Sequence, residues 1–415
     1  MELDARRAVA ETYQREWARV LAATIRTARD LDLAEEAVQD AFTQALTVWG
    51  RDGMPRNPGA WLTTTAKRRA LDSLRRASTY RVKLQLLIEP DHDEGDDAKM
   101  GTTDKGEGDV VADDTMRLVF MCCHPSLSSE AQMALTLRLV CGMSTPDIAR
   151  CFLVSETTMS ARLTRAKKKI SIARIPFQVP EPTDLPGRLG AVLGVVYLLF
   201  TIGHTAPTGE DLMRIETAGE ALRLARFLHE LAPERHEVSG LLALLLVNDA
   251  RRASRLSADG RALRISEQDR SAWDHAAIDE ARDLIAAQVP SGVPDQYTLQ
   301  ASIALLHAQA PAYDEVDWPE IVRLYDQLLL AWPSPVVQLN RAVALANTLG
   351  PQVALEVVMG LERDGQLNRY QYLPAVKAYL LDQLGQSNEA QLARTRAFEL
   401  ATNQVERDFL LRQNE

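Results

Sequence analysis

The sequence has no long hydrophobic run, and this absence argues against a protein with membrane-spanning helices. Its longest apolar stretch, Leu189 to Gly203, has fifteen residues and contains three glycines, whereas a helix that crosses a bilayer needs about 20 apolar residues. We therefore expect a buried helix there. The first fourteen residues are polar and do not resemble a cleavable signal peptide, so we expect the protein to be cytoplasmic.

Cysteine is also scarce, and the four cysteines all lie between residues 122 and 151. The sequence Cys122-Cys123-His124 raises the question of a zinc site, but adjacent cysteines chelate one metal poorly and no C-x-x-C pair is present. Cys141 and Cys151 lie in apolar helical patterns. Buried, reduced thiols are the preferred interpretation, and we expect no metal or cofactor.

Catalytic motifs are missing as well. We find no phosphate-binding loop, metal cluster or nucleophile motif, which makes an enzyme the least favoured class, although the seven histidines leave it open. The length of 415 residues, with 46% hydrophobic and 25% charged residues, is typical of a globular protein of two to four domains.

Positive charge is concentrated in two places although the formal net charge of the chain is −10. Residues 1–83 carry +4 and residues 117–175 carry +6, while residues 84–116 contain eleven acids and two lysines and the last 240 residues carry −11. We expect the acidic segment to be a flexible linker, with tethering favoured over shielding of the basic modules from stray DNA. The acidic C-terminal part should not touch DNA.

The segment from Cys141 to Ile172 predicts a helix-turn-helix. Thr145 is expected to cap a short helix with Pro146 at its first position, and Ser155 is expected to cap a second helix. One face of the second helix is apolar, with Met159, Leu163, Ala166 and Ile170. The opposite face carries Thr157, Ser160, Ala161, Arg162, Thr164, Arg165 and Lys168. From Arg150 to Arg174 there are seven basic residues and one acid, so nucleic-acid binding is favoured over a merely solvated basic helix.

The N-terminal module predicts three helices, over residues 11–29, over residues 33–49 and from Pro58 onward. In the second helix, Glu35, Gln39, Asp40 and Thr43 are expected outside the core. In the third, Leu62, Ala66, Ala70, Ser73 and Ala77 share one face, and Trp61, Thr64, Arg68, Asp72 and Arg75 share another. Eight basic residues and a single acid lie between Arg56 and Lys83, a density that suits phosphate binding.

The C-terminal part is expected to be helical throughout. The candidate helices cover residues 185–203, 210–231, 234–255, 272–288, 296–310, 318–331, 335–348, 351–362, 372–384, 387–401 and 403–413. Several pair as tetratricopeptide-like hairpins, although no regular period of about 34 residues holds and Arg394 stands where an aromatic residue is usual. Stacked hairpins form grooves for peptides, so binding of a protein or peptide partner is the functional interpretation; a passive stabilising extension is the alternative.

With both basic modules described, the chain resembles a bacterial sigma factor of the extracytoplasmic-function type. LAEEAVQDAFTQAL followed by PRNPGAWLTTTAKRRALDSLRR resembles that family's region two, and LSSEAQMALTLRLVCGMSTPDIARCFLVSETTMSARLTRAKKKI resembles region four. FMCCHPSLSSEAQMALTLR, LPGRLGAVLGVVYLLF and the long helical C-terminus resemble the subgroup with a tetratricopeptide-like (DUF6596-type) extension. The resemblance implies an all-α fold with region two in residues 1–84, a linker in 85–116, region four in 117–175 and the extension in 176–415.

The resemblance also implies a function: binding of core RNA polymerase and recognition of promoter DNA. Glu36, Gln39, Asp40 and Phe42 would dock the clamp helices of the polymerase β′ subunit, with core packing equally open for Phe42. Leu135, Leu137 and Val140 are candidates for contact with the β flap, or equally for the core.

Two sets of residues would read the promoter. The −10 set is Asn57, Trp61, Thr64, Lys67, Arg68, Asp72, Arg75 and Arg76, where bases stack on an aromatic ring and cations follow the backbone. Trp61 could equally be core, and Arg68 stands where the family often has asparagine, so the base preference stays open.

The −35 set is divided by chemistry. Glu156, Thr157, Ser160, Ala161 and Thr164 would read base edges, and Arg162, Arg165, Lys167 and Lys168 would meet phosphates, with Arg162 suited to either role.

Two rival functions remain on sequence grounds: a helix-turn-helix regulator with a helical sensor domain, and a scaffold whose basic segments bind nucleic acid nonspecifically. The fused acidic helical part favours regulation of the sigma factor by its own C-terminal half.

Overall fold

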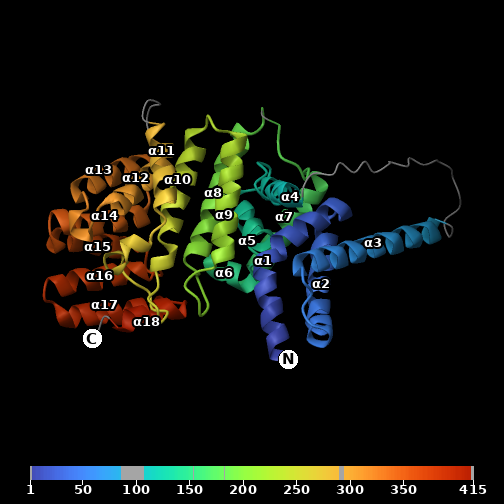
Figure 1. Cartoon of the computed structure of the whole chain (residues 1–415), viewed down its shortest axis with the longest axis horizontal. Helices are drawn as coiled ribbons and strands as arrows, with labels where there is room; N and C mark the ends of the chain where they lie inside the picture. The colour runs from blue at the N-terminus through green and yellow to red at the C-terminus, as the bar shows by residue number, and fades with distance from the viewer. Residues whose placement is uncertain (1, 86–106, 153, 182, 289–293, 413–415) are drawn as a thin grey trace. The chain divides into compact units, whose positions relative to one another are not determined.

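The computed structural model describes residues 2–85, 107–152, 154–181, 183–288 and 294–412, and its regular elements are helices (Figure 1). Within these ranges the only strand-like pairings are two isolated bridges, Gly209 with Asn403 and Leu256 with Ala262. The predicted all-α fold is therefore confirmed. The chain divides into two compact units, residues 1–195 and 196–415.

Unit 1 begins with three helices that pack on one another: α1 (Glu2–Ala28), α2 (Leu31–Asp52) and α3 (Pro58–Gln85). Asp30 begins α2 by accepting a hydrogen bond from the backbone N–H of Leu33 at 2.9 Å. The first part of the predicted apolar face of α3 lies in the core, where Leu62, Ala66 and Ala70 are fully buried. Ser73 is half-buried, and the side chain of Ala77 lies outside the described part. The far end of α3 projects beyond α1 and α2 (Figure 1), so the bundle leaves the polar side of α3 exposed.

Helix α4 (Glu107–Cys122) begins inside the segment expected to be a linker. Residues 86–106 of that segment lie outside the described residues. The linker was predicted from its acidic composition, and that composition did not reveal the start of α4. Acidic residues are also favoured near a helix N-terminus, where the helix dipole stabilises them. From Asp114 onward the residues of α4 are buried except for the half-buried Arg117, and the Asp114 carboxylate pairs with Arg26 of α1 at 3.3 Å.

The helix-turn-helix is present, with one change at its start. It comprises α6 (Thr145–Cys151) and α7 (Glu156–Ile172), and α5 (Ser129–Leu139) precedes it. The hydroxyl of Ser144, not that of Thr145, accepts the hydrogen bond from the Asp147 N–H at 3.3 Å. Two adjacent hydroxyl residues both fit a cap, and the neighbour of the expected residue takes the position.

The second helix of the motif matches the sequence analysis closely. Ser155 caps α7 by accepting from the Thr158 N–H at 3.2 Å. Met159, Leu163, Ala166 and Ile170 are all buried, which fixes α7 on the core through one face and leaves the other for solvent.

Unit 2 is a succession of helices. They are α8 (Pro186–His204), whose first residues belong to unit 1, α9 (Ile215–Leu231), α10 (His236–Ala250), α11 (His275–Ala286), α12 (Gln296–Gln309), α13 (Trp318–Ala331), α14 (Pro335–Thr348), α15 (Pro351–Asp364), α16 (Tyr372–Gln383), α17 (Ser387–Leu400) and α18 (Gln404–Arg412). From α12 to α18 each helix packs on the next, as in stacked hairpins.

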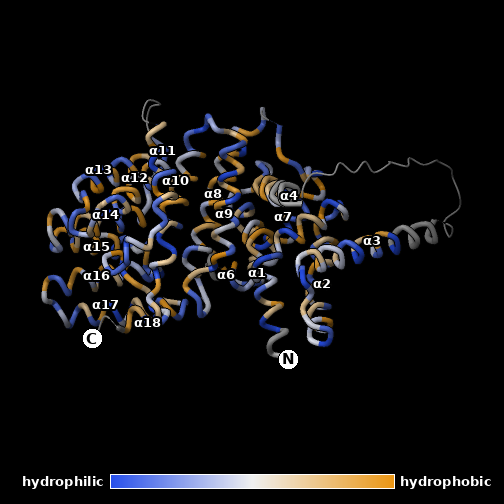
Figure 2. The backbone as a smooth tube through the Cα atoms, in the orientation of Figure 1, coloured by the Kyte–Doolittle hydropathy of each residue, from blue (hydrophilic) through white to orange (hydrophobic). Residues whose placement is uncertain are grey.

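Hydrophobic residues recur along these helices with hydrophilic ones between them (Figure 2). Helices α10 and α12 approach so closely that a Cβ added at Gly240 would lie 2.8 Å from the Thr298 backbone nitrogen. Helix α8 is the one described helix long and apolar enough to span a membrane, but half of its most apolar window is buried, as in the core helix we expected.

Candidate nucleic-acid interface

The predicted −10 residues lie along the outer side of α3. Asn57, Thr64, Arg68, Asp72, Arg75 and Arg76 are exposed, and Trp61 and Lys67 are half-buried. The side chain of Asn57 accepts from the Ala60 N–H at 3.0 Å and so begins the helix. Trp61 packs edge-on against the buried Trp49, with ring centroids 5.6 Å apart, so its ring is part core and part surface.

Asp72 is the one acidic residue in the sequence of α3, beside several cations. Asp72 pairs with Arg75 at 3.6 Å, and its backbone carbonyl accepts from Arg76 at 3.3 Å. Burial and the nearby Arg26 lower the pKa of Lys67, partly offset by Asp114.

Arg69, which the sequence analysis did not single out, is half-buried and reaches toward α2. Its guanidinium pairs with Asp40 at 2.7 Å and donates to Gln44 at 3.0 Å. Arg69 therefore holds α3 on α2 while its neighbour Arg68 remains exposed.

Most predicted −35 residues form the outer face of α7. Glu156, Thr157, Ser160, Ala161, Thr164, Arg165 and Lys168 are exposed. Arg162 is half-buried: it pairs with Glu130 at 3.1 Å and lies over the Phe152 ring at 5.6 Å. Both partners belong to the same module, so Arg162 also braces the helix-turn-helix.

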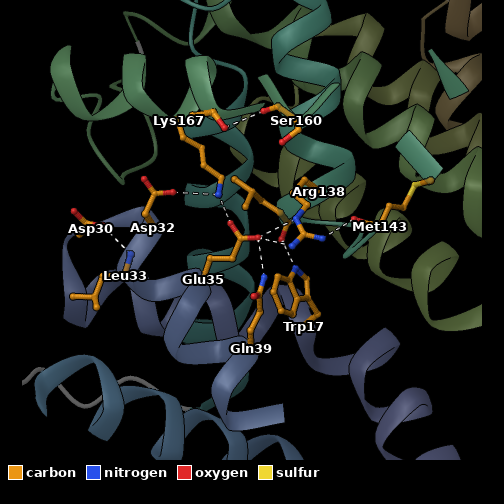
Figure 3. Close-up of polar contacts among 12 residues, drawn as sticks. Trp17, Asp30, Asp32, Leu33, Glu35, Gln39, Arg138, Met143, Ser160 and Lys167 are labelled. Atoms are coloured by element: carbon orange, nitrogen blue, oxygen red, sulfur yellow. Dashed lines mark hydrogen bonds and ion pairs between the residues drawn. The ribbon is translucent and has the colours of Figure 1, made fainter. Parts of the chain in front are cut away.

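Lys167 differs from the rest of the −35 set because it points toward α2 and not toward solvent (Figure 3). Its ammonium pairs with Asp32 at 3.2 Å and with Glu35. The lysine expected to meet phosphate is thus engaged inside unit 1.

Glu35 is the centre of this junction, which comprises Glu35, Arg138 and Lys167 (Figure 3). Its carboxylate is only 6% exposed and also accepts from Arg138 at 2.7 Å. Arg138 in turn donates to the backbone carbonyl of Met143 at 3.0 Å. The expectation that Glu35 lies outside the core is therefore wrong: it is buried because two cations from α5 and α7 reach it.

Backbone contacts reinforce the junction. The indole of Trp17 donates to the Leu139 carbonyl at 3.1 Å. Gly142 has φ +64°, and a Cβ there would lie 3.1 Å from both Trp17 and Tyr13. Helix α1 therefore packs against the segment between α5 and α6 at Gly142. A larger residue at this position would cause strain.

The pairing of the junction residues was not predicted from the sequence because the partners are distant in the chain. The one available signal was Glu35 beside Ala34 and Val38, an acid at a position adjoining an apolar helical face. A charged residue in that position needs a partner, but nothing in the sequence names it.

The residues expected to dock polymerase lie on α2. Glu36, Gln39 and Asp40 are exposed, whereas Phe42 is 5% exposed and packs on Tyr13 with ring centroids 5.0 Å apart. Phe42 and Gln39 also line an open groove of about 480 Å³ between α1 and α2. Phe42 thus belongs to the core and also borders a surface hollow.

The other open alternatives concern the β flap and the thiols. Leu135, Leu137 and Val140 are buried, as a core role requires.

Cys122 and Cys123 are buried too, and burial raises the pKa of Cys123 to about 12. The side chain of Cys151 lies outside the described part. Among the described residues no cluster of His, Cys, Asp or Glu could hold a metal ion.

Comparison with known families agrees with this arrangement of two cationic helices. Sigma-70 region 2 matches residues 10–80, Sigma-70 region 4 matches residues 117–170, and a family of unknown function, DUF6596, matches residues 188–289. The chain belongs to the sigma-70 family. In this family member, region two spans α1 to α3, region four includes α5 to α7, and the DUF6596 match begins with α8.

A curated relative covers almost the whole sigma-70 family chain. It is the Uncharacterized protein R00370 of Rhizobium meliloti (strain 1021), 40% identical over 392 residues, which are 94% of this chain and 91% of the relative. No solved structure matches the chain. The two sigma-70 regions give the protein a sigma-factor role in promoter recognition, with promoter DNA and core RNA polymerase as the partners that the family implies.

Proposed function

We propose that this protein is an alternative sigma factor of the extracytoplasmic-function type, acting in the cytoplasm without enzymatic activity. It binds core RNA polymerase and directs initiation at a narrow class of promoters. The observation that carries the proposal is the pair of exposed cationic faces, on α3 and on α7, within one unit whose remaining surface includes an apolar groove.

At the −10 element, α3 acts on separated strands. Trp61 is anchored by its T-shaped contact with Trp49 and stacks an unpaired base on a face of its ring, and Thr64 and Asp72 hydrogen-bond to base edges. Arg68, Arg75 and Arg76 follow the phosphates, assisted by Asn57 and Lys67.

At the −35 element, the N-terminal half of α7 enters the major groove. Thr157, Ser160 and Thr164 are short and exposed, so the helix approaches the base edges closely, with Glu156 and Ala161 beside them. Arg165 and Lys168 meet phosphates. Arg162 and Lys167 reach DNA only after leaving Glu130 and Glu35.

Polymerase docking uses the surface of α2. Glu36, Gln39 and Asp40 offer polar contacts to the β′ clamp helices, and the groove bordered by Phe42 receives an apolar side chain. The β flap contacts region four, where Met133 is 37% exposed while Leu135 and Leu137 are buried, so Met133 is the better-placed apolar contact.

Unit 2 regulates the sigma factor through a partner or ligand of its own. Gly240→Ala, which forces α10 and α12 apart, should change promoter output without touching unit 1. The matched control is Gly219→Ala, where an added Cβ meets nothing within 4 Å. Equal output from both variants would leave unit 2 as a stabilising extension.

The decisive experiment is in vitro transcription with purified core polymerase and a promoter library. Initiation from a defined promoter class is expected, and it should be lost on replacing Arg68 and Arg75 together, or Arg165 and Lys168 together, with alanine. Repression or no initiation would favour a helix-turn-helix regulator.

The matched control for these double variants removes two cations from unit 2. Arg282→Ala with Arg323→Ala alters exposed side chains and should leave initiation at the wild-type level. If this control lost as much activity as the α3 or α7 variants, general charge and not the two faces would explain the result.

A further inference from the structure

Unit 2 contains a partly open cavity that the promoter-recognition role does not use. Its volume is about 320 Å³, and its walls come from α8, α10, α12, α13 and α14. Phe200, Leu244, Ile303 and Val337 supply apolar surface. Cavities of roughly 300–1,000 Å³ with apolar walls and a few convergent polar groups are typical of small-molecule sites.

One cation faces this cavity, and no acid does. Arg251 is the single charged residue among the lining side chains. It donates to the Asn248 side chain at 3.2 Å and lies 6.0 Å from the Trp273 ring. Among the described residues no carboxylate pairs with Arg251, whereas its neighbour Arg252 pairs with Asp249 at 3.4 Å.

The other arginines nearby have structural partners. Arg270 donates to the backbone carbonyls of His307 and Ala310, at 2.7 and 2.8 Å, at the C-terminal end of α12. Arg255 donates to the carbonyl of His204 at the end of α8 and to Thr205 at 3.0 Å. Cations at helix C-termini satisfy the last carbonyls. Arg251 is itself the C-cap residue of α10, but in the described part of the chain its guanidinium donates to the Asn248 side chain and to no backbone carbonyl.

Two histidines in the lining present buried nitrogens without partners. His204 Nε2 and His307 Nδ1 have no hydrogen-bond partner in the described part of the chain. Burial, with the Arg255 and Arg251 charges, lowers the pKa of His204 to about 2, and burial with Arg251 and Arg270 lowers that of His307 to about 4. Both imidazoles are therefore neutral at physiological pH, and each has a buried ring nitrogen whose hydrogen-bonding capacity is unused in the described part of the chain.

We propose that this cavity binds a small organic carboxylate, whose apolar body lies among Phe200, Leu244 and Ile303 and whose carboxylate pairs with Arg251. The neutral imidazoles complete the hydrogen bonding. A single negative charge matches the single cation, whereas a phosphate dianion would bury an uncompensated charge. The regulatory meaning of such a ligand rests on the proposed sigma-factor function; its binding does not.

The test uses the purified full-length protein with benzoate and phenylacetate as probes, and benzamide and phenylacetamide as neutral analogues of the same shape. Isothermal titration and thermal unfolding should show carboxylate binding, with the amides at least ~10-fold weaker because they lack the charge-assisted bond. Arg251→Gln should weaken carboxylate binding by a similar factor. Arg252→Gln, the adjacent control, should bind as wild type does.

A second variant distinguishes loss of the binding site from loss of the fold. Ala304→Phe fills the cavity from α12 and should abolish binding while helical content by circular dichroism is unchanged. Absence of carboxylate binding, equal binding of amides, or full binding by Arg251→Gln or Ala304→Phe would overturn the proposal. The assay contains no polymerase or DNA, so a negative result would leave the transcription role standing, and failed initiation would leave the cavity's ligand standing.

Discussion

Replacing Glu35 with glutamine tests how strongly regions two and four of this sigma-70 family protein hold together. The substitution keeps the size of the side chain and removes its charge. The carboxylate is 6% exposed, and the side chains of its partners Arg138 and Lys167 are each 18% exposed. Two largely buried cations would therefore lose their shared counterion.

The free-energy cost of opening the junction depends on the interactions that Arg138 and Lys167 retain. Breaking a buried ion pair from one side typically costs about 3–5 kcal/mol. Here Arg138 retains the Met143 carbonyl and Lys167 retains Asp32, so we expect about 2–3 kcal/mol for opening of the junction. That corresponds to an opening equilibrium about 30- to 150-fold larger.

Amide hydrogen exchange of the full chain, followed by mass spectrometry, measures this opening. Slow amides in peptides from α2, α5 and α7 should exchange faster by that factor in Glu35→Gln. Glu36→Gln is the matched control, since Glu36 is adjacent and exposed and should change stability by less than about 0.5 kcal/mol. Equal exchange in the two variants would refute the reasoning.

Three further predictions concern other parts of the chain. Gly142→Ala should destabilise unit 1 by about 1–2 kcal/mol in thermal unfolding, because φ is +64° and the new Cβ would lie 3.1 Å from Trp17. His307 has a pKa lowered from 6.5 to about 4, so its protonation favours the unfolded state. The contribution of His307 should be complete above pH 6.5 and fall by about 1.4 kcal/mol per pH unit toward pH 4. His307→Gln should reduce the total acid slope by that amount, and the slope due to His204, whose pKa is lowered to about 2, should remain. Replacing Arg165 or Lys168 with alanine should each reduce the slope of log K for promoter DNA against log salt by about 1, and an unchanged slope would place that residue away from phosphate.

Local patterns in the sequence were sufficient to predict most of the helices. The core face of α7 and its Ser155 cap depend on residues three and four apart, and such spacing is visible without a structure. The starts of α6 and α4 differ from the prediction for local reasons. Ser144 takes the cap position expected for Thr145, and the acidic residues interpreted as linker are compatible with a helix that starts at Glu107.

The junction could not be predicted in the same way. Glu35 and Arg138 are 103 residues apart in the chain, so no local period connects them. Lys167 was assigned to phosphate by its charge and its place on a basic helix, and only the packing of α7 near α2 reveals that its ammonium has carboxylate partners. Arg251 is a comparable case, because burial and the lack of an acid are properties of the folded environment.

The shared carboxylate also limits how sigma factors of this kind can be recombined. A chimera that received its helix-turn-helix from a relative would need cations at the positions of Arg138 and Lys167, or Glu35 would be left buried with no countercharge. Exchange of promoter specificity by module swapping should therefore succeed only when these three positions are transferred as a set.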